Sequence, residues 1–192
     1  MSKIPTREEA LNLLQKHVTN DALIKHALAV EAVMAHFAEK FGEDVEKWRT
    51  IGLVHDLDYE KYPEEHCHKT REILEAENWP EEYIRAIQSH GYGICTDVEP
   101  LEKMEKVLYT IDELTGLINA TVLLRPGKSI LDLTPKSVKK KWKQKGFAAG
   151  VNRELIEKGM QMLGMEQDEV IAETIKGMQK VAEEIGLKGT LE

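Results

Sequence analysis

The sequence predicts a soluble all-α protein, and three observations support this fold class. Residues that favour helices, notably Leu, Glu, Lys, Ala and Met, are plentiful. Apolar residues recur at helical spacing along most of the chain, whereas no segment alternates in the way that is typical of a strand. The 192 residues, of which 42% are hydrophobic and 31% are charged, suit an ordinary globular domain with a substantial core.

Capping residues mark the first three predicted helices. Thr6, followed three residues later by a glutamate, has the spacing of a capping box and predicts a first helix of about three turns. Asn20 or Asp21 can cap a second helix, which Gly42 closes after a long apolar stripe. Apolar residues at helical spacing then predict a third helix over residues 45–55.

Prolines and glycines delimit the remaining predicted helices. A helix is expected over residues 65–77, and Pro80 opens the next one, which ends at a Gly-Tyr-Gly segment. Pro100 opens a longer helix, which the run Arg125-Pro126-Gly127 breaks. Three shorter helices are predicted after it, near residues 136–145, 153–163 and 168–185.

The charge and the apolar pattern exclude several functional classes. The formal net charge of −8 gives the chain no general attraction to nucleic acid or to an anionic membrane, so an anionic ligand needs a local site. No apolar run approaches the ~20 residues that span a bilayer, and no signal-peptide core follows Met1. Cys67 and Cys95 form no CxxC pair and no disulfide framework. We therefore expect a cytoplasmic protein that binds neither nucleic acid nor membrane.

Four residues at or near apolar helical positions carry donor groups that suit a metal ion. The pair His55-Asp56 ends an apolar helix, and His26 and Asp112 lie among apolar residues of two other helices. A buried imidazole or carboxylate is costly unless it is paired or bound to a metal. Nitrogen and oxygen donors are those that first-row divalent metals prefer. A hydrogen-bonded network of histidine and aspartate is the alternative.

These four residues resemble, in their order and helical setting, the H…HD…D signature of the HD-domain phosphohydrolase superfamily. The resemblance covers roughly residues 20–120, and the whole chain is similar to a small bacterial group of predicted HD hydrolases. It implies an all-α HD-domain helical bundle. It also implies a metal-binding core over residues 1–125 and a C-terminal helical extension, residues 126–192, packed on the same domain.

The resemblance implies two further histidine ligands, because many members of the superfamily hold two metals. His66 and His90 lie in segments similar to those of the family, and His68 would replace His66 if His66 pointed away. Cys67 and Thr70 depart from the family pattern, so a surface position for His66 and a helix-end role for His90 stay open. The implied cofactor is one or two ions of Mn, Fe, Ni or Co, with Mg also conceivable.

The resemblance implies hydrolysis of a phosphoester or phosphoanhydride, with a nucleotide as the favoured substrate. In this mechanism a metal-activated water attacks phosphorus and Asp56 bridges the two ions. Asp58 would serve as a general base or as a hydrogen-bond acceptor behind the ligands. The alternative is a non-catalytic HD-type module that senses a nucleotide or binds another protein.

Basic residues outside the metal site are candidates for holding the substrate phosphates. Many HD proteins carry a lysine three residues after the Asp, where this chain has Tyr59, and Lys61 is the nearest cation. A basic run later in the chain leads us to expect that at least one of Arg125, Lys128 and Lys140 borders the metal cavity. The alternative is that these residues form a solvated surface.

Overall fold

The computed structural model describes residues 1–191, which form nine α-helices and one short 3₁₀ turn and contain no strand. The predicted all-α fold class is therefore confirmed. None of the helices in this part of the chain has the length and the apolar character needed to cross a membrane. The helices are α1 (Arg7–His17), α2 (Asp21–Phe41), α3 (Val45–Val54), α4 (His68–Ala76), α5 (Glu81–Ser89), α6 (Lys103–Leu123), α7 (Pro135–Trp142), α8 (Arg153–Leu163) and α9 (Gln167–Gln179).

The early helices begin and end at the capping residues that the sequence suggested. Thr6 forms the complete capping box at the start of α1. Asn20, rather than Asp21, caps α2, because its side-chain oxygen accepts hydrogen bonds from the amides two and three residues later. Gly42 closes α2 in the left-handed conformation, with φ of 69°, where a glycine carries no steric cost.

Four helices are shorter than predicted. Helix α6 begins at Lys103 rather than at Pro100, and α7 ends at Trp142 rather than near residue 145. The helix expected over residues 65–77 begins only at His68, because Pro63–Glu65 forms the 3₁₀ turn and Cys67 adopts a left-handed φ of 71°. The last helix ends at Gln179 instead of near residue 185. The chain turns after it, so that the carbonyl of Leu187 accepts a hydrogen bond from the amide of Ile130, 2.8 Å away.

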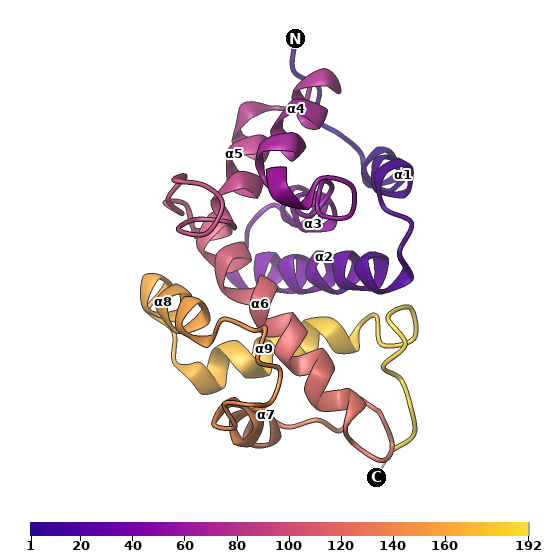
Figure 1. Ribbon diagram of the computed structural model, residues 1–192, viewed down its shortest axis with the longest axis vertical. Helices are drawn as coiled ribbons and strands as arrows, with labels where there is room; N and C mark the ends of the chain where they lie inside the picture. Colours follow the sequence, from indigo (N-terminus) through magenta and orange to yellow (C-terminus); the bar gives the residue numbers. More distant parts are fainter. Residues whose placement is uncertain (192) are drawn as a thin grey trace.

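Helix α2 forms the centre of the packing. Figure 1 shows α6 running from the α1–α5 part of the fold to the part that contains α7, α8 and α9. Helices α3, α6 and α9 all pack against α2, and α8 packs against α6. A single cluster of buried apolar side chains extends from Ala10 in α1 to Leu187. Burial of this cluster supplies the main stabilisation of the fold.

Helix α3 approaches α2 closely at Gly52. A Cβ atom at this position would lie 2.9 Å from Met34 Cγ and 3.0 Å from the carbonyl oxygen of Val30. Because real Cβ atoms essentially never come within 3.0 Å of another heavy atom, a larger residue would displace the Met34 side chain and crowd the backbone of α2. Glycine therefore sets the distance between α2 and the end of α3, where His55 and Asp56 follow.

Candidate metal centre

Two histidines and two aspartates from three parts of the fold converge on one point. His26 lies on α2, Asp112 lies on α6, and His55 and Asp56 follow the last residue of α3. His26 Nε2 is 2.9 Å from Asp112 Oδ1 and 3.2 Å from His55 Nε2. Asp56 Oδ2 is 3.2 Å from His55 Nε2 and 3.4 Å from His26 Nε2. One donor atom of each residue lies within 4.8 Å of the others, so the group fits a metal site.

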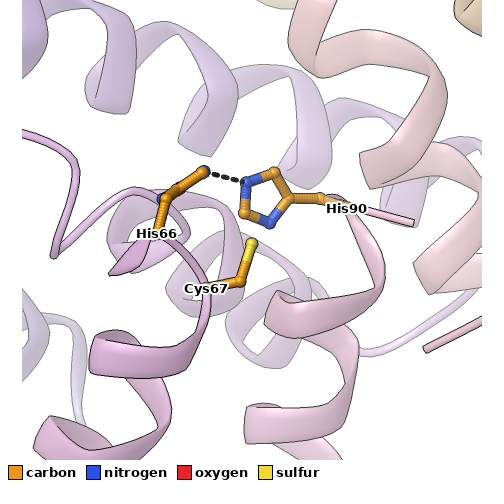
Figure 2. Close-up of side chains that lie close together, drawn as sticks. All are labelled: His66, Cys67 and His90. Atoms are coloured by element: carbon orange, nitrogen blue, oxygen red, sulfur yellow. Dashed lines mark hydrogen bonds between the residues drawn. The ribbon is translucent and has the colours of Figure 1, made fainter. Parts of the chain in front are cut away.

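A second pair of histidines faces the other oxygen of Asp56. His66 Nε2 and His90 Nε2 are 3.2 Å apart, the contact marked by the dashed line in Figure 2, and the two rings meet edge to face. Asp56 Oδ1 lies 3.2 Å from His90 Nε2 and 3.4 Å from His66 Nε2. His68 is exposed at the start of α4. The structure therefore brings His66, and not His68, to the site, with Asp56 between two pairs of histidines.

Backbone carbonyls fix the orientation of two of the histidines. His55 Nδ1 donates a hydrogen bond to the carbonyl oxygen of Gly52, at 2.7 Å. His90 Nδ1 donates in the same way to the carbonyl oxygen of Ile87. Each acceptor lies three residues earlier in the chain, near the end of a helix. With Nδ1 committed to a carbonyl oxygen, Nε2 is the nitrogen directed at the site, and in the neutral ring it carries the lone pair that a metal-binding histidine uses.

Asp58 performs the same task for His66. Its side chain is fully buried; Oδ1 accepts a hydrogen bond from His66 Nδ1 at 2.6 Å, and Oδ2 accepts one from the amide of Thr70 at 2.8 Å. Both oxygens are thus engaged, and the residue does not line the cavity beside the donors. Of its two predicted roles, this geometry fits the acceptor behind the ligands and argues against the general base.

The buried charges shift one another's pKa values. Burial would lower the pKa of His26, but hydrogen bonds to Asp112 and Asp56 outweigh burial and raise it to about 9. The pKa of His55 is likewise raised against the effect of burial by the charges of Asp56 and Asp112. Burial would raise the pKa values of both aspartates, but the charge of His55 and the hydrogen bonds from His26 and His55 together outweigh burial and hold both values well below their ordinary range. Two ionised carboxylates with surrounding imidazoles form a donor set that suits a divalent cation.

A cavity of about 340 Å³ opens onto both groups of donors. A neighbouring hollow of about 260 Å³ shares His26 and Gly116 with it. A Cβ atom at Gly116 would meet only Val151 Cγ2, at 3.9 Å, so this glycine leaves unfilled space on the wall that the two hollows share. Besides the metal-donor residues, Gly116 and Val151, the residues that line the cavity are Leu23, Tyr59, Gly91, Ile94, Cys95, Glu113 and Leu155.

The structure does not bring Arg125, Lys128 or Lys140 to this cavity. The guanidinium of Arg125 binds the carboxylate of Asp132, at 2.7 Å, just beyond the end of α6. Lys128 is exposed in the following turn, and Lys140 lines a different groove between α7 and α9. The reason is the path of the chain, since α7 packs on the far part of α6 and on α9. The expectation that one of these cations borders the metal cavity is thus corrected.

Lys61 also lies outside the cavity. Its ammonium group donates a hydrogen bond to the carbonyl oxygen of Lys16, 3.1 Å away, at the end of α1. The position that carries a lysine in many HD proteins is occupied by Tyr59, which is 48% exposed and lines the cavity. The Tyr59 ring meets the ring of His66 edge to face, with centroids 5.4 Å apart.

Sequence reasoning missed two polar residues of the cavity wall. Glu113 directly follows Asp112, and Oε2 accepts a hydrogen bond from the amide of Asn152, 3.1 Å away, at the start of α8. Burial raises the pKa of Glu113. Cys95 lies in the loop after α5 and is half-buried. Adjacency to Asp112 could have indicated Glu113, whereas no spacing in the sequence indicates the position of Cys95.

Comparison with known families adds one finding. The family described as HD domain matches residues 23–121, slightly more than half of the chain. This range includes all six donor residues of the two groups, from His26 to Asp112. No curated protein and no solved structure matches the chain.

Proposed function

Since the chain belongs to the HD domain family, we propose that it is a metal-dependent phosphohydrolase that cleaves a phosphoester or phosphoanhydride of a small molecule. The observation that carries this proposal is the position of Asp56. Its two carboxylate oxygens face two separate pairs of histidines, all within 3.4 Å. A carboxylate in this position suits a bridge between two cations.

The six donor residues could hold two ions, with Asp56 as a ligand of both. His26, His55 and Asp112 would hold one, and His66 and His90 would hold the other. Four imidazoles favour Mn, Fe, Co or Ni over Mg, which prefers oxygen ligands. When bound, such ions would make a water molecule more acidic and would neutralise the negative charge that develops on the phosphate.

The remaining polar residues have separate tasks. Asp58 holds the ring of His66 through Nδ1 and so keeps Nε2 directed at the site. Glu113 is our candidate for transferring a proton to the leaving oxygen, because its carboxyl group lies on the cavity wall beside Asp112. The hydrogen bond from the Asn152 amide to Oε2 fixes the carboxyl group in this place and leaves Oε1 for the substrate.

The charges around the cavity support a substrate with one reacting phosphate and a largely neutral remainder. Among the described residues that line the two hollows, Lys25 is the one lysine or arginine, and its ammonium group binds Asp21 at 2.7 Å. Glu113 adds a further carboxyl group. Apolar walls such as Leu23 and Ile94 suit an organic leaving group, and a nucleoside is the first candidate. A chain of additional phosphates would find few cations there.

A metal-supplemented activity screen tests the proposal. Purified protein would be assayed with Mn²⁺, Co²⁺ or Ni²⁺ against nucleoside monophosphates, cyclic nucleotides and dinucleoside polyphosphates. We expect hydrolysis of at least one monophosphate and at least 10³-fold less (an order-of-magnitude figure, about 4 kcal/mol) in Asp56→Ala, which loses the shared ligand. Full activity in Asp56→Ala contradicts the mechanism. Binding of a nucleotide without turnover, in protein that elemental analysis shows to be metal-loaded, favours the non-catalytic module.

A further inference from the structure

The two cysteines meet next to the second pair of histidines. Cys67 directly follows His66, and Cys95 lies in the loop that follows His90. Their Sγ atoms are 2.7 Å apart, although 28 positions separate them in the sequence. Figure 2 shows the Cys67 side chain directed towards His90. The chain contains no other cysteine, so this pair accounts for all of its thiols.

The backbone brings the two sulfur atoms together in three ways. Cys67 adopts a left-handed φ of 71° immediately before α4. Cys95 lies in a tight loop in which three successive amides, those of residues 94–96, donate hydrogen bonds to the carbonyl oxygen of Gly91. Gly91 lies between the segments, and a Cβ atom there would overlap both sulfur atoms. The absence of a side chain at this position is what lets the sulfurs meet.

We propose that Cys67 and Cys95 form an oxidisable pair that hydrogen peroxide closes to an intramolecular disulfide. This inference does not depend on the hydrolase activity. Cys95 is half-buried and lines the cavity, whereas Cys67 is fully buried. Peroxide entering the cavity therefore reaches Cys95 first.

The reaction balances in two steps. Cys95 Sγ attacks one peroxide oxygen, the O–O bond breaks, and the second oxygen leaves as water after taking up the thiol proton; Cys95 becomes a sulfenic acid. Cys67 Sγ then attacks Cys95 Sγ, the S–O bond breaks, and the hydroxide leaves as water with the proton of Cys67. The two thiols lose two electrons, and one hydrogen peroxide is reduced to two waters.

The disulfide changes the surroundings of the second metal position. It joins the segment that carries His66 covalently to the loop after His90. In the reduced protein, Cys67 Sγ lies within 4.8 Å of donor nitrogens of His66 and His90 and is available as a soft ligand. In the disulfide it is not, so oxidation leaves only nitrogen and oxygen donors at this position.

Thiol counting and intact mass measurement on the full-length protein test the proposal. The reduced protein has two titratable thiols after denaturation. After treatment with hydrogen peroxide we expect none, with a mass about 2 Da lower, a monomer on a non-reducing gel, and recovery of both thiols with dithiothreitol. Peptide mapping should find the two cysteines linked.

Two single variants test the order of the steps. In Cys67→Ser, Cys95 should stop at the sulfenic acid, which dimedone captures. In Cys95→Ser, the buried Cys67 should keep its thiol under the same treatment. Two remaining thiols in the wild-type protein, a sulfonic acid at Cys95, or a disulfide-linked dimer would each overturn the proposal.

Discussion

At the scale of single residues, the orientation of His66 depends on Asp58, which lies behind the histidine and contributes no ligand atom of its own. Asp58 is buried, and both of its oxygens accept hydrogen bonds, one from His66 and one from the Thr70 amide. Residues that hold a metal-binding histidine through its second nitrogen commonly contribute about 10–100-fold to metal affinity. The role of Asp58 is therefore open to a direct measurement.

The change Asp58→Ala should weaken binding of a second Mn²⁺ or Co²⁺ ion by about 10–100-fold, because His66 loses the acceptor that fixes its ring. Isothermal titration and elemental analysis of the metal content would measure this. Lys61→Ala is the matched control in the same loop, since Lys61 binds only the Lys16 carbonyl oxygen at the surface. Equal metal content and affinity in Asp58→Ala and wild-type protein would refute the positioning role.

Glu113→Gln should lower kcat by about 10²-fold while the metal content stays unchanged, because the amide cannot give a proton to the leaving oxygen. The loss should be larger for alkyl phosphates than for para-nitrophenyl phosphate, whose leaving group needs no proton. Steady-state kinetics with both substrates would show this difference. An equal loss for the two substrates would assign Glu113 a structural role through its contact with the Asn152 amide.

At the scale of helices, α9 is fastened to α2 by a pair of partly buried polar side chains. Glu173 Oε2 on α9 lies 2.5 Å from His36 Nε2 on α2. Burial alone would raise the pKa of Glu173, but the hydrogen bonds from His36 and Lys176 outweigh burial and lower it. A carboxyl group with a lowered pKa in the folded protein stabilises the fold above its unfolded pKa, near 4.5. That stabilisation is lost as the pH falls through the lowered value.

Glu173→Gln should therefore reduce the free energy of unfolding at pH 7 by about 1 kcal/mol and should remove part of its decline below pH ~4.5. Urea unfolding of both proteins over a series of pH values would measure the difference. Glu184→Gln, an exposed change shortly after the same helix, serves as the control. A constant difference between Glu173→Gln and wild type down to low pH would exclude the proposed ion pair.

Most helices could be predicted because their signals are local in the sequence. A few helix ends could not, because they depend on features that the local sequence does not show. Thr6, Asn20 and Gly42 act within one turn of chain, so their effects are visible in the sequence itself. The start of α4 is different. There Cys67 adopts a left-handed backbone, and no residue type in the segment signals it. The early end of α9 likewise depends on contacts with residues near Ile130, far away in the sequence.

At the scale of the whole molecule, the basic run of α7 lies on a different part of the surface from the metal donors. Lys140→Glu should therefore change KM by less than about twofold for monophosphate and polyphosphate substrates alike, because exposed charges are screened beyond about 8–10 Å. Lys25→Glu, which alters the wall of the hollow next to His26, is the comparison variant and should raise KM. A rise in KM specific to polyphosphates in Lys140→Glu would restore α7 as a substrate-binding element.

The convergence of the histidines and aspartates could be predicted and the position of the basic residues relative to the cavity could not, for one physical reason. A buried imidazole or carboxylate needs a partner wherever it lies, so His26, His55 and Asp112 indicate a site before any distance is known. An exposed lysine has no such requirement. Its position relative to the site depends on how α7 packs against α6 and α9, and the sequence pattern contains no measure of that arrangement.

Gly52 joins helix packing to the orientation of a metal-binding side chain. Its missing side chain allows α3 to lie against α2, and its carbonyl oxygen holds His55 Nδ1. Replacing a helical glycine with alanine is a common way to raise thermostability, because alanine has the higher helix propensity. At Gly52 the added Cβ atom would clash with α2, so this substitution is unsuitable here. The two roles of Gly52 also mean that the donor set cannot be transplanted onto another scaffold as a list of ligands. A recipient bundle would have to reproduce the separation of these two helices at the same residue that supplies the acceptor.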